Sequence, residues 1–209
     1  MKELQKKNLK NVSIVIENHK GWLTTAKTFK NKANDYGIRI LDEQFVSPNE
    51  RDFRTLLLKM KQKQPDVYIL IMFPTGLESF ARAMKEQDIK TPVTSLNSLD
   101  FVEDKTLFEG VWYASDNIEN TDLENQYKQI YHKDLLVAQS LFGYAALDAV
   151  INAYEQFDTK PTGEELIQKL YELRLNSPVG DVQYQGNGIL HGQGMLRIIK
   201  DGKSVKLEE

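Results

Sequence analysis

The sequence has no cysteine and only three histidines among its 209 residues. The lack of thiols excludes disulfide bonds, cysteine nucleophiles and thiolate metal sites together. His19, His132 and His191 are far apart, and none has another histidine or a carboxylate at the short spacings typical of metal sites. The sequence therefore predicts no metal site and no cofactor.

Long apolar runs and an excess of positive charge are also missing. The longest apolar stretches, such as residues 67–74, are far shorter than the roughly 20 residues that span a bilayer. Residues 1–10, MKELQKKNLK, have neither the apolar core nor the cleavage site of a secretory signal. The net charge of -3 argues against a nucleic-acid partner, which normally selects a basic surface. We expect neither a membrane span nor nucleic-acid binding.

The common catalytic signatures are absent as well. There is no GxSxG turn, no GxxxxGK[ST] phosphate loop and no GxGxxG segment after a strand. We therefore predict that the protein is not an enzyme. An enzyme built on a flavodoxin-like sheet stays open as a lesser alternative, because a fold does not fix a function.

The first half of the chain alternates apolar strand patterns with helical patterns. Strands are predicted at 11–16, 38–45, 66–72, 91–96 and 110–115, and one helix is expected to begin at Ser47-Pro48. In residues 66–84, DVYILIMFPTGLESFARAM, the strand is apolar at nearly every position, which is typical of a parallel sheet covered on both faces. The pattern predicts an α/β fold with a three-layer, flavodoxin-like parallel sheet.

The pattern changes after residue 115. A polar segment at 116–122 is followed by predicted helices at 123–132, 135–157 and 162–173, a strand at 181–184, and a hairpin around Asp201-Gly202. We expect residues 1–115 and 194–209 to form one α/β domain. Residues 116–193 are expected to form a second, mainly helical domain.

Several segments in order resemble the second half of type I periplasmic binding proteins of the branched-chain amino acid and amide group. They are KNVSIVIENHKGW, DFRTLLLKMKQKQPDVYIL with its flanks, FEGVWYAS, SLFGYAALDAV and SPVGDVQYQGNG. The resemblance implies two α/β lobes, joined by a three-segment hinge, that close on a small ligand. Only the C-terminal portion of the family pattern is matched, from about residue 10 onward.

The resemblance therefore implies that an upstream lobe precedes this segment and that Met1 is internal to a longer parent sequence. In that reading residues 116–193 are the returning part of the first lobe without its sheet. Helix 135–157 has apolar residues on more than one face, which indicates neighbours on two sides. We expect either self-association through 120–175 or a piece of a longer protein.

Two candidate ligand contacts follow the third predicted strand. The family places an aromatic wall and backbone groups at the position of Phe73, Pro74 and Thr75. A helix that begins near Thr75 also directs free N–H groups toward the crevice beyond the sheet, where α/β proteins bind ligands. The alternatives are that Phe73 belongs to the core and that Thr75 is an N-cap.

Two further candidates, Lys20 and Trp22, follow the first predicted strand. Relatives usually carry a tyrosine where this chain has Lys20, which either attracts an anionic ligand or lies in solvent. Trp22 either stacks on a ligand at the mouth of the crevice or packs on the adjacent loop.

The remaining candidates are Asn97, Gln139 and Ser140. Amino-acid-binding relatives often carry an acid near Asn97, whose amide has no full charge, so an amide or another neutral polar ligand is as consistent as an amino acid. Gln139 and Ser140 lie where the family's returning helix begins, and they either face the crevice or lie on an inert helix surface.

The resemblance implies an extracytoplasmic solute-binding protein that delivers an amino acid or amide to the permease of an ABC importer. The parent protein is then periplasmic, or extracellular and attached to the membrane. The main alternative is a ligand-sensing regulatory domain of the same fold.

Overall fold

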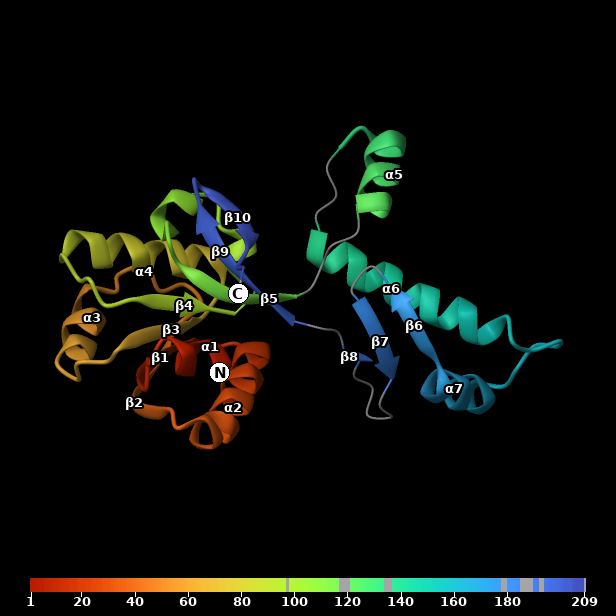
Figure 1. Cartoon of the computed structure of the whole chain (residues 1–209), viewed down its shortest axis with the longest axis horizontal. Coiled ribbons are helices and arrows are strands. Elements are labelled where there is room, and N and C mark those ends of the chain that lie inside the picture. The colour runs from red at the N-terminus through yellow and green to blue at the C-terminus, as the bar shows by residue number, and fades with distance from the viewer. Residues whose placement is uncertain are drawn as a thin grey trace. The chain divides into compact units, whose positions relative to one another are not determined.

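The computed structural model describes residues 1–96, 98–116, 121–133, 137–177, 180–184, 190–191 and 194–208. The chain forms two compact units (Figure 1). Unit 1 comprises Met1–Ser115 and Leu196–Glu209, and unit 2 comprises Asp116–Met195. Both chain ends therefore belong to unit 1.

Unit 1 is built on a parallel sheet of four strands in the order β2-β1-β3-β4. The strands are β1 (Asn11–Glu17), β2 (Arg39–Val46), β3 (Val67–Ile71) and β4 (Val93–Ser95), and each neighbouring pair is parallel. A parallel bridge between Leu96 and Ala114 leads from β4 to β5 (Trp112–Asp116). The predicted parallel α/β sheet is thus confirmed.

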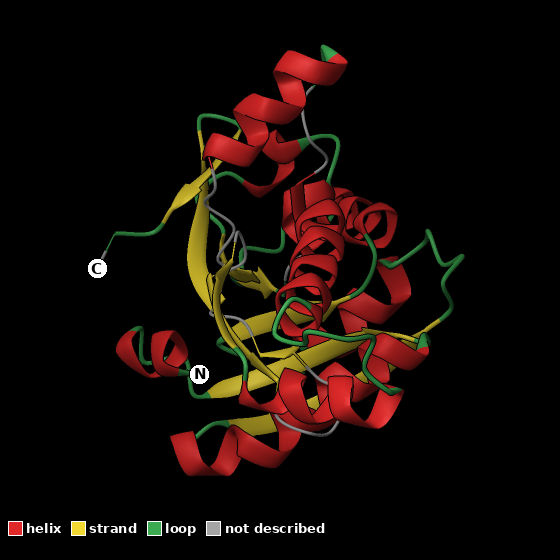
Figure 2. Cartoon of the chain, turned by 90° about the vertical axis from the view of Figure 1, so that its right-hand side faces the viewer, coloured by secondary structure: helices red, strands yellow, loops and turns green. Residues whose placement is uncertain are grey.

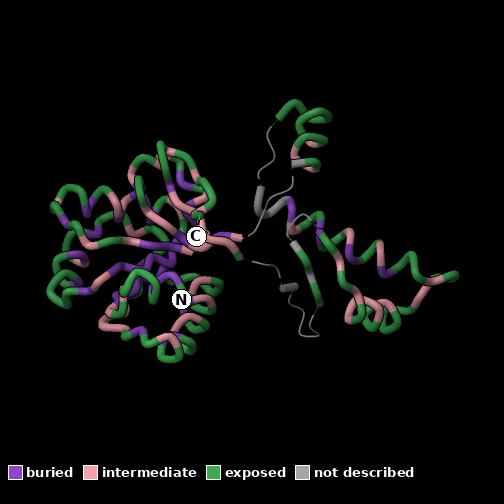
Figure 3. Tube along the Cα trace, viewed as in Figure 1, coloured by how far each residue is buried: buried purple, intermediate pink, exposed green. Residues whose placement is uncertain are grey.

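Helices cover both faces of this sheet (Figure 2). They are α1 (Lys2–Lys6), α2 (Lys20–Ala33), α3 (Arg54–Lys61) and α4 (Pro74–Glu86), with short 3-10 turns η1 (Asn34–Tyr36), η2 (Ser98–Phe101) and η3 (Lys105–Phe108). Along β1, Ile14 and Ile16 pack with α1 and α2, whereas Val15 faces α3 and α4. Both faces of the central strands are therefore buried (Figure 3).

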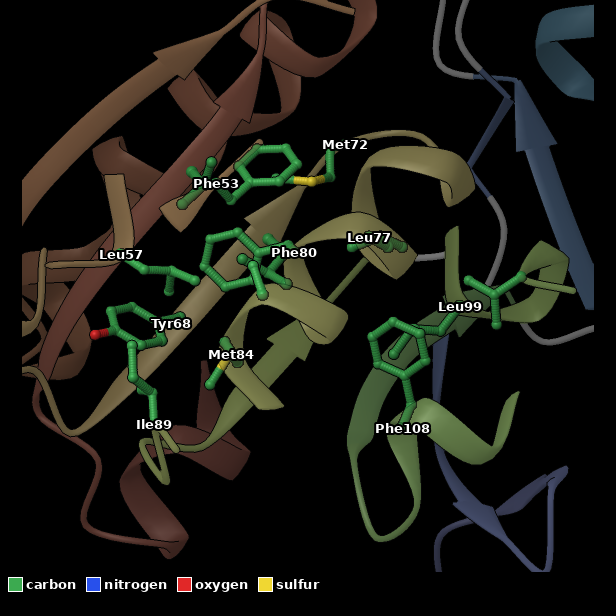
Figure 4. Close-up of a cluster of buried hydrophobic side chains, with 14 of the residues drawn as sticks. Phe53, Leu57, Tyr68, Met72, Leu77, Phe80, Met84, Ile89, Leu99 and Phe108 are labelled. Carbon is green, nitrogen blue, oxygen red and sulfur yellow. The ribbon is translucent and has the colours of Figure 1, made fainter. Parts of the chain in front are cut away.

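The core under α3 and α4 is organised by three aromatic rings (Figure 4). The ring of Phe80 contacts that of Phe53 edge-on at 5.4 Å between centroids, and that of Tyr68 at 5.9 Å. Leu57 fills the space beside them and is fully buried. This packing fixes α4 against β3, and so fixes where the first turn of α4 lies.

The expected start of α3 at Ser47-Pro48 is wrong, because the helix begins at Arg54. Ser47 instead closes a turn, in which its carbonyl accepts the N–H of Glu50 at 2.9 Å. Asp52 takes over the role of accepting a helix N–H, since its Oδ1 lies 3.1 Å from the backbone nitrogen of Arg54. The hydrogen bonds from Arg54 lower the pKa of Asp52 to about 2.

The C-terminal hairpin completes unit 1. It consists of β9 (Gly194–Lys200) and β10 (Lys203–Lys206), which pair antiparallel and join β5 in the order β10-β9-β5. Asp201 and Gly202 turn the chain with φ angles of 52° and 67°. Positive φ at both central residues is the preferred hairpin geometry, so the predicted turn is confirmed.

A polar cluster joins this hairpin to β5 and η2. The carboxylate of Asp100 accepts hydrogen bonds from Tyr113, at 2.6 Å, and from the hydroxyl of Ser115. Ser204 lies 2.5 Å from the Tyr113 hydroxyl and accepts the Nε–H of Arg197 at 2.6 Å. Burial, and then the neighbouring carboxylate, raise the pKa of Tyr113 above its ordinary value.

Unit 2 contains α5 (Thr121–Tyr131), α6 (Val137–Tyr154) and α7 (Gly163–Glu172), close to the predicted helices. It also has an antiparallel sheet of β6 (Arg174–Ser177), β7 (Gly180–Tyr184) and β8 (Leu190–His191), of which only β7 was predicted. Thr162 and Glu165 form a capping box that starts α7. In the described part of the chain, no helix is long and apolar enough to cross a membrane.

Two adjacent leucines of α3 test the packing of unit 1. Leu57 is fully buried and Leu58 is 56% exposed. We expect Leu57→Ala to lower the free energy of unfolding by about 2 to 5 kcal/mol through lost contacts and a cavity. Leu58→Ala is the control and should stay within about 0.5 kcal/mol. Urea unfolding measures both, and equal effects would contradict the described burial.

Tyr113→Phe tests the polar cluster. Because the folded state raises the pKa of Tyr113, its contribution to stability is complete below the unfolded pKa of about 10 and decreases as the pH rises above it. We expect the variant to lose about 1 kcal/mol at pH 8. Above about pH 10 the variant should lose stability less steeply than the parent protein. Urea titrations at several pH values measure the free energy of unfolding of both proteins. An equally steep loss of stability with pH in the variant and the parent protein would count against the cluster.

Candidate functional site

The carboxyl ends of β1 and β3 meet at one edge of the sheet in unit 1, because the two strands are parallel neighbours. In open α/β sheets this edge is where ligands bind. A side chain links the two ends directly, since the Oε2 atom of Glu17 accepts the backbone N–H of Phe73 at 2.9 Å. Residues 18–22 and 73–76 therefore lie close together.

An aromatic cluster stands at this edge. The ring of Phe73 makes edge contacts with His19, at 5.1 Å between centroids, and with Trp22, at 5.3 Å. Phe73 is 39% exposed, so its ring is not enclosed in the core of unit 1. The structure thus brings Trp22 and Phe73 together and adds His19, the residue before α2.

Glu17 is a buried carboxylate beside this cluster. It is only 2% exposed, and its Oε1 atom has no hydrogen-bond partner among the described residues. The indole Nε1 of Trp22 is buried and unpartnered in the same part of the chain. Buried polar groups are nearly always hydrogen-bonded, so these two atoms are unsatisfied polar groups next to the cluster.

Gly76 allows the first turn of α4 to approach Glu17. A Cβ atom at this position would lie 3.1 Å from Sδ of Met72 and 3.4 Å from Oε2 of Glu17. The positive end of the helix dipole therefore faces the carboxylate at close range.

The first turn of α4 differs in detail from the expectation. The N-cap is Phe73 and Pro74 is the first helical residue, so Thr75 is not the N-cap. Thr75 is exposed, and its hydroxyl accepts a hydrogen bond from Nη2 of Arg51 at 3.3 Å. Arg51 also donates to the carbonyl oxygens of Pro48 and Glu50, at 3.0 and 2.6 Å. A guanidinium group is thereby held near the start of α4.

The other predicted site residues are not gathered in this cluster. Lys20 is exposed and begins α2. Asn97 lies outside the described residues. Gln139 and Ser140 are in the first turn of α6 in unit 2, and their side chains are outside the described part. Within the described ranges, no group of three or more histidine and acidic residues could hold a metal ion.

Three residues at this edge were not predicted: Glu17, His19 and Arg51. One signal was available for Glu17, which is the only charged residue of a largely apolar strand and stands at its end. His19 and Arg51 lie in polar loops, and only the folded chain shows that they approach Phe73 and Thr75.

A parallel α/β sheet with an aromatic and polar cluster at its carboxyl edge is the arrangement in which open α/β sheets bind ligands. The family model described as periplasmic binding protein matches residues 4–199. The chain therefore belongs to the periplasmic binding protein family, and the resemblance expected from its ordered segments is confirmed. This is a family of solute-binding proteins of transport systems.

Solved structures show the same type I fold. A branched-chain amino acid ABC transporter periplasmic ligand-binding protein from Burkholderia xenovorans aligns with a TM-score of 0.84 at 14% identity, over 99% of this chain and 60% of that one. An ABC transporter substrate-binding protein from Desulfitobacterium hafniense, in complex with Leu, aligns at 0.76 and 24% identity over 98% and 62%. A solute-binding protein from Rhodopseudomonas palustris, in complex with 3,4-dihydroxybenzoic acid, aligns at 0.76 and 19% over 99% and 61%.

The chain thus spans about three fifths of the length of the solved relatives it matches. No curated protein matches it. At sequence identities below 25%, the structural similarity establishes the fold of this chain. It does not identify the ligand.

The aromatic cluster predicts a fluorescence change. In a Trp112→Phe background, Trp22 is the only indole, because the chain has two tryptophans. We expect Phe73→Ala to shift the emission of Trp22 to longer wavelength, since it removes the ring that covers one side of the indole. Leu58→Ala, at a 56% exposed position on α3, is the control and should leave the spectrum unchanged. Identical spectra for all three proteins would contradict the contact.

Proposed function

We propose that the chain is the ligand-binding part of an extracytoplasmic solute-binding protein that serves an ABC importer. The observation that carries this proposal is the cluster of His19, Trp22 and Phe73 beside the buried carboxylate of Glu17. The cluster combines exposed aromatic surface with a carboxylate and an indole N–H that have atoms without a hydrogen-bond partner among the described residues, and small-molecule sites combine apolar and polar groups in this way. Membership of the periplasmic binding protein family supports the extracytoplasmic location and the permease partner.

The proposed ligand is a small amino acid or amide. Its apolar part packs on Phe73 and Trp22, and its polar groups are bound by Lys20, Thr75 and Asn97. The two solved relatives described above bind leucine and a dihydroxybenzoic acid, so an aromatic acid is the competing ligand class. Arg51 supports a carboxylate in either class, because its guanidinium lies next to Thr75.

The two units take different parts in this proposal. Residues 1–115 and 194–209 form the lobe that carries the aromatic cluster. Residues 116–193 correspond to the returning part of the family's other lobe, and Gln139 and Ser140 are the ligand contacts proposed from it. Burial of most of a small ligand needs both sides, so we expect weaker binding by this chain than by a protein with both lobes complete.

A fluorescence titration tests the proposal. In the Trp112→Phe background, leucine, asparagine, benzoate and 4-hydroxybenzoate are titrated while the emission of Trp22 is followed. We expect saturable quenching by leucine or asparagine, and at least a tenfold weaker response in Phe73→Ala, because a buried aromatic contact is worth about 1.4 kcal/mol or more. Asn97→Ala should weaken binding in the same direction.

Leu58→Ala serves as the control, since it removes an exposed apolar side chain of α3, on the other face of the sheet from α2. Saturation by the benzoates alone would overturn the amino acid or amide assignment and retain a solute-binding site. Equal affinity in the Phe73→Ala and Leu58→Ala variants would remove the site itself.

A further inference from the structure

Glu17 is hydrogen-bonded to two of the three residues of the aromatic cluster. Its backbone carbonyl accepts the N–H of His19 at 2.7 Å, and its side-chain Oε2 accepts the N–H of Phe73 at 2.9 Å. The rings of His19 and Phe73 lie 5.1 Å apart between centroids. One residue at the end of β1 therefore joins the two turns from which these rings come.

The backbone of Phe73 is fixed on both sides. Its N–H is bonded to Glu17, and its carbonyl oxygen accepts the N–H groups of Gly76 and Leu77 at 3.0 and 3.1 Å. Pro74 follows, and a proline restricts the residue before it to extended backbone, in agreement with the φ of -70° and the ψ of 160° at Phe73. While the bond to Glu17 holds, the ring of Phe73 can turn only about its own side-chain bonds.

The donors at the start of α4 are almost all used within the protein. Glu17 takes the N–H of Phe73, and Pro74 has none. The last two N–H groups of the first turn bond to the carbonyl oxygen of Phe73. Among residues 73–77, only Thr75 has an N–H without a hydrogen bond in the described part of the chain. What this helix start offers a ligand is therefore chiefly the ring of Phe73.

Glu17 acts from a buried position. It is 2% exposed, whereas Phe73 is 39% exposed. Glycine at position 76 leaves room for the carboxyl group of Glu17, since a Cβ atom there would lie 3.4 Å from Oε2. Burial separates the two roles: Phe73 forms the surface that a ligand meets, and Glu17 affects the ligand through the residue that it holds.

Glu78 provides a comparison within the same unit. It is 8% exposed, and its Oε1 accepts the backbone N–H groups of Glu103 and Asp104 at 2.7 and 3.2 Å. Like Glu17, it is a buried carboxyl group that fixes a turn by hydrogen bonds to backbone N–H groups. Its turn leads into η3, and neither of these partners belongs to the aromatic cluster. Loss of either glutamate side chain should destabilise unit 1, but only Glu17 should control the aromatic cluster.

We propose that Glu17 is a positioning residue of the binding site, which holds the rings of Phe73 and His19 in the arrangement that a ligand meets. This inference rests on the function proposed above, because the aromatic cluster is the ligand surface named there. The acceptor oxygen of Glu17 is the property that matters, since it fixes the N–H of Phe73. A glutamine retains such an oxygen, and a leucine does not.

Emission spectra without ligand test the positioning. In the Trp112→Phe background, Glu17→Leu should shift the emission of Trp22 to longer wavelength, because the ring of Phe73 no longer stays against the indole. Glu17→Gln should restore the parent spectrum. Glu78→Leu and Glu78→Gln are the matched controls. Both should emit as the parent does, while urea unfolding shows a loss of stability in Glu78→Leu.

A titration with leucine tests the effect on the ligand. Glu17→Leu should bind leucine about tenfold more weakly than the parent, and Glu17→Gln should recover the affinity to within about threefold. In a Phe73→Ala background, Glu17→Leu should cause no further loss, because a residue that acts through Phe73 has nothing left to position. Asparagine replaces leucine as the probe if the parent binds only asparagine.

Three results would overturn the inference. The first is a folded Glu17→Leu variant with the parent spectrum, and the second is an equal shift in Glu17→Leu and Glu78→Leu. The third is a further loss of affinity on adding Glu17→Leu to Phe73→Ala, which would show that Glu17 acts on the ligand by another route. If Glu17→Leu does not fold, Glu17→Asp takes its place. This variant keeps the carboxyl group, shortens its reach by one methylene and should shift the spectrum in the same direction.

Failure of the proposed function gives a different pattern. A parent protein that binds none of the probes would contradict the ligand site, while the Trp22 spectra would still decide whether Glu17 positions Phe73. The two failures are therefore distinguishable.

Discussion

The structure of unit 1 depends on one constraint, the burial of parallel strands on both faces. Because β1 and β3 are apolar on both sides, helices must cover each face, and each helix must return the chain to the same end of the sheet. All strands then finish at one edge, which gathers the turns before α2 and α4. The contact of Trp22 with Phe73 and the hydrogen bond from Phe73 to Glu17 are consequences of that common direction.

The fold of unit 1 was predictable from the sequence because it is encoded in periodicity. Unbroken apolar runs such as VYILI identify buried strands, and Asp201-Gly202 identifies a hairpin through its left-handed backbone. The start of α3 was not predictable in this way. Ser47 and Pro48 are a good helix start, but the same residues also close a turn, and the packing of Phe53 and Leu57 decides between the two.

The candidate site was only partly accessible to sequence reasoning. Phe73 and Trp22 were proposed because each follows a predicted strand, and the structure places their rings in contact. Arg51 and His19 come from loops whose course depends on the whole unit, so no local pattern places them at this edge. In unit 2, β6 was missed because Arg174–Ser177 directly follows a helix without a turn signal and contains little apolar sequence.

The position of the C-terminal hairpin has a consequence for biosynthesis. Strand β9 pairs beside β5, but almost all of unit 2 is translated between them, so unit 1 cannot finish its second sheet until residues 194–206 leave the ribosome. Until then the emerging chain presents β5 with an unpaired edge, a form that favours wrong strand pairing. Nascent chains of this protein should accordingly depend on chaperones more than a domain with contiguous sequence does.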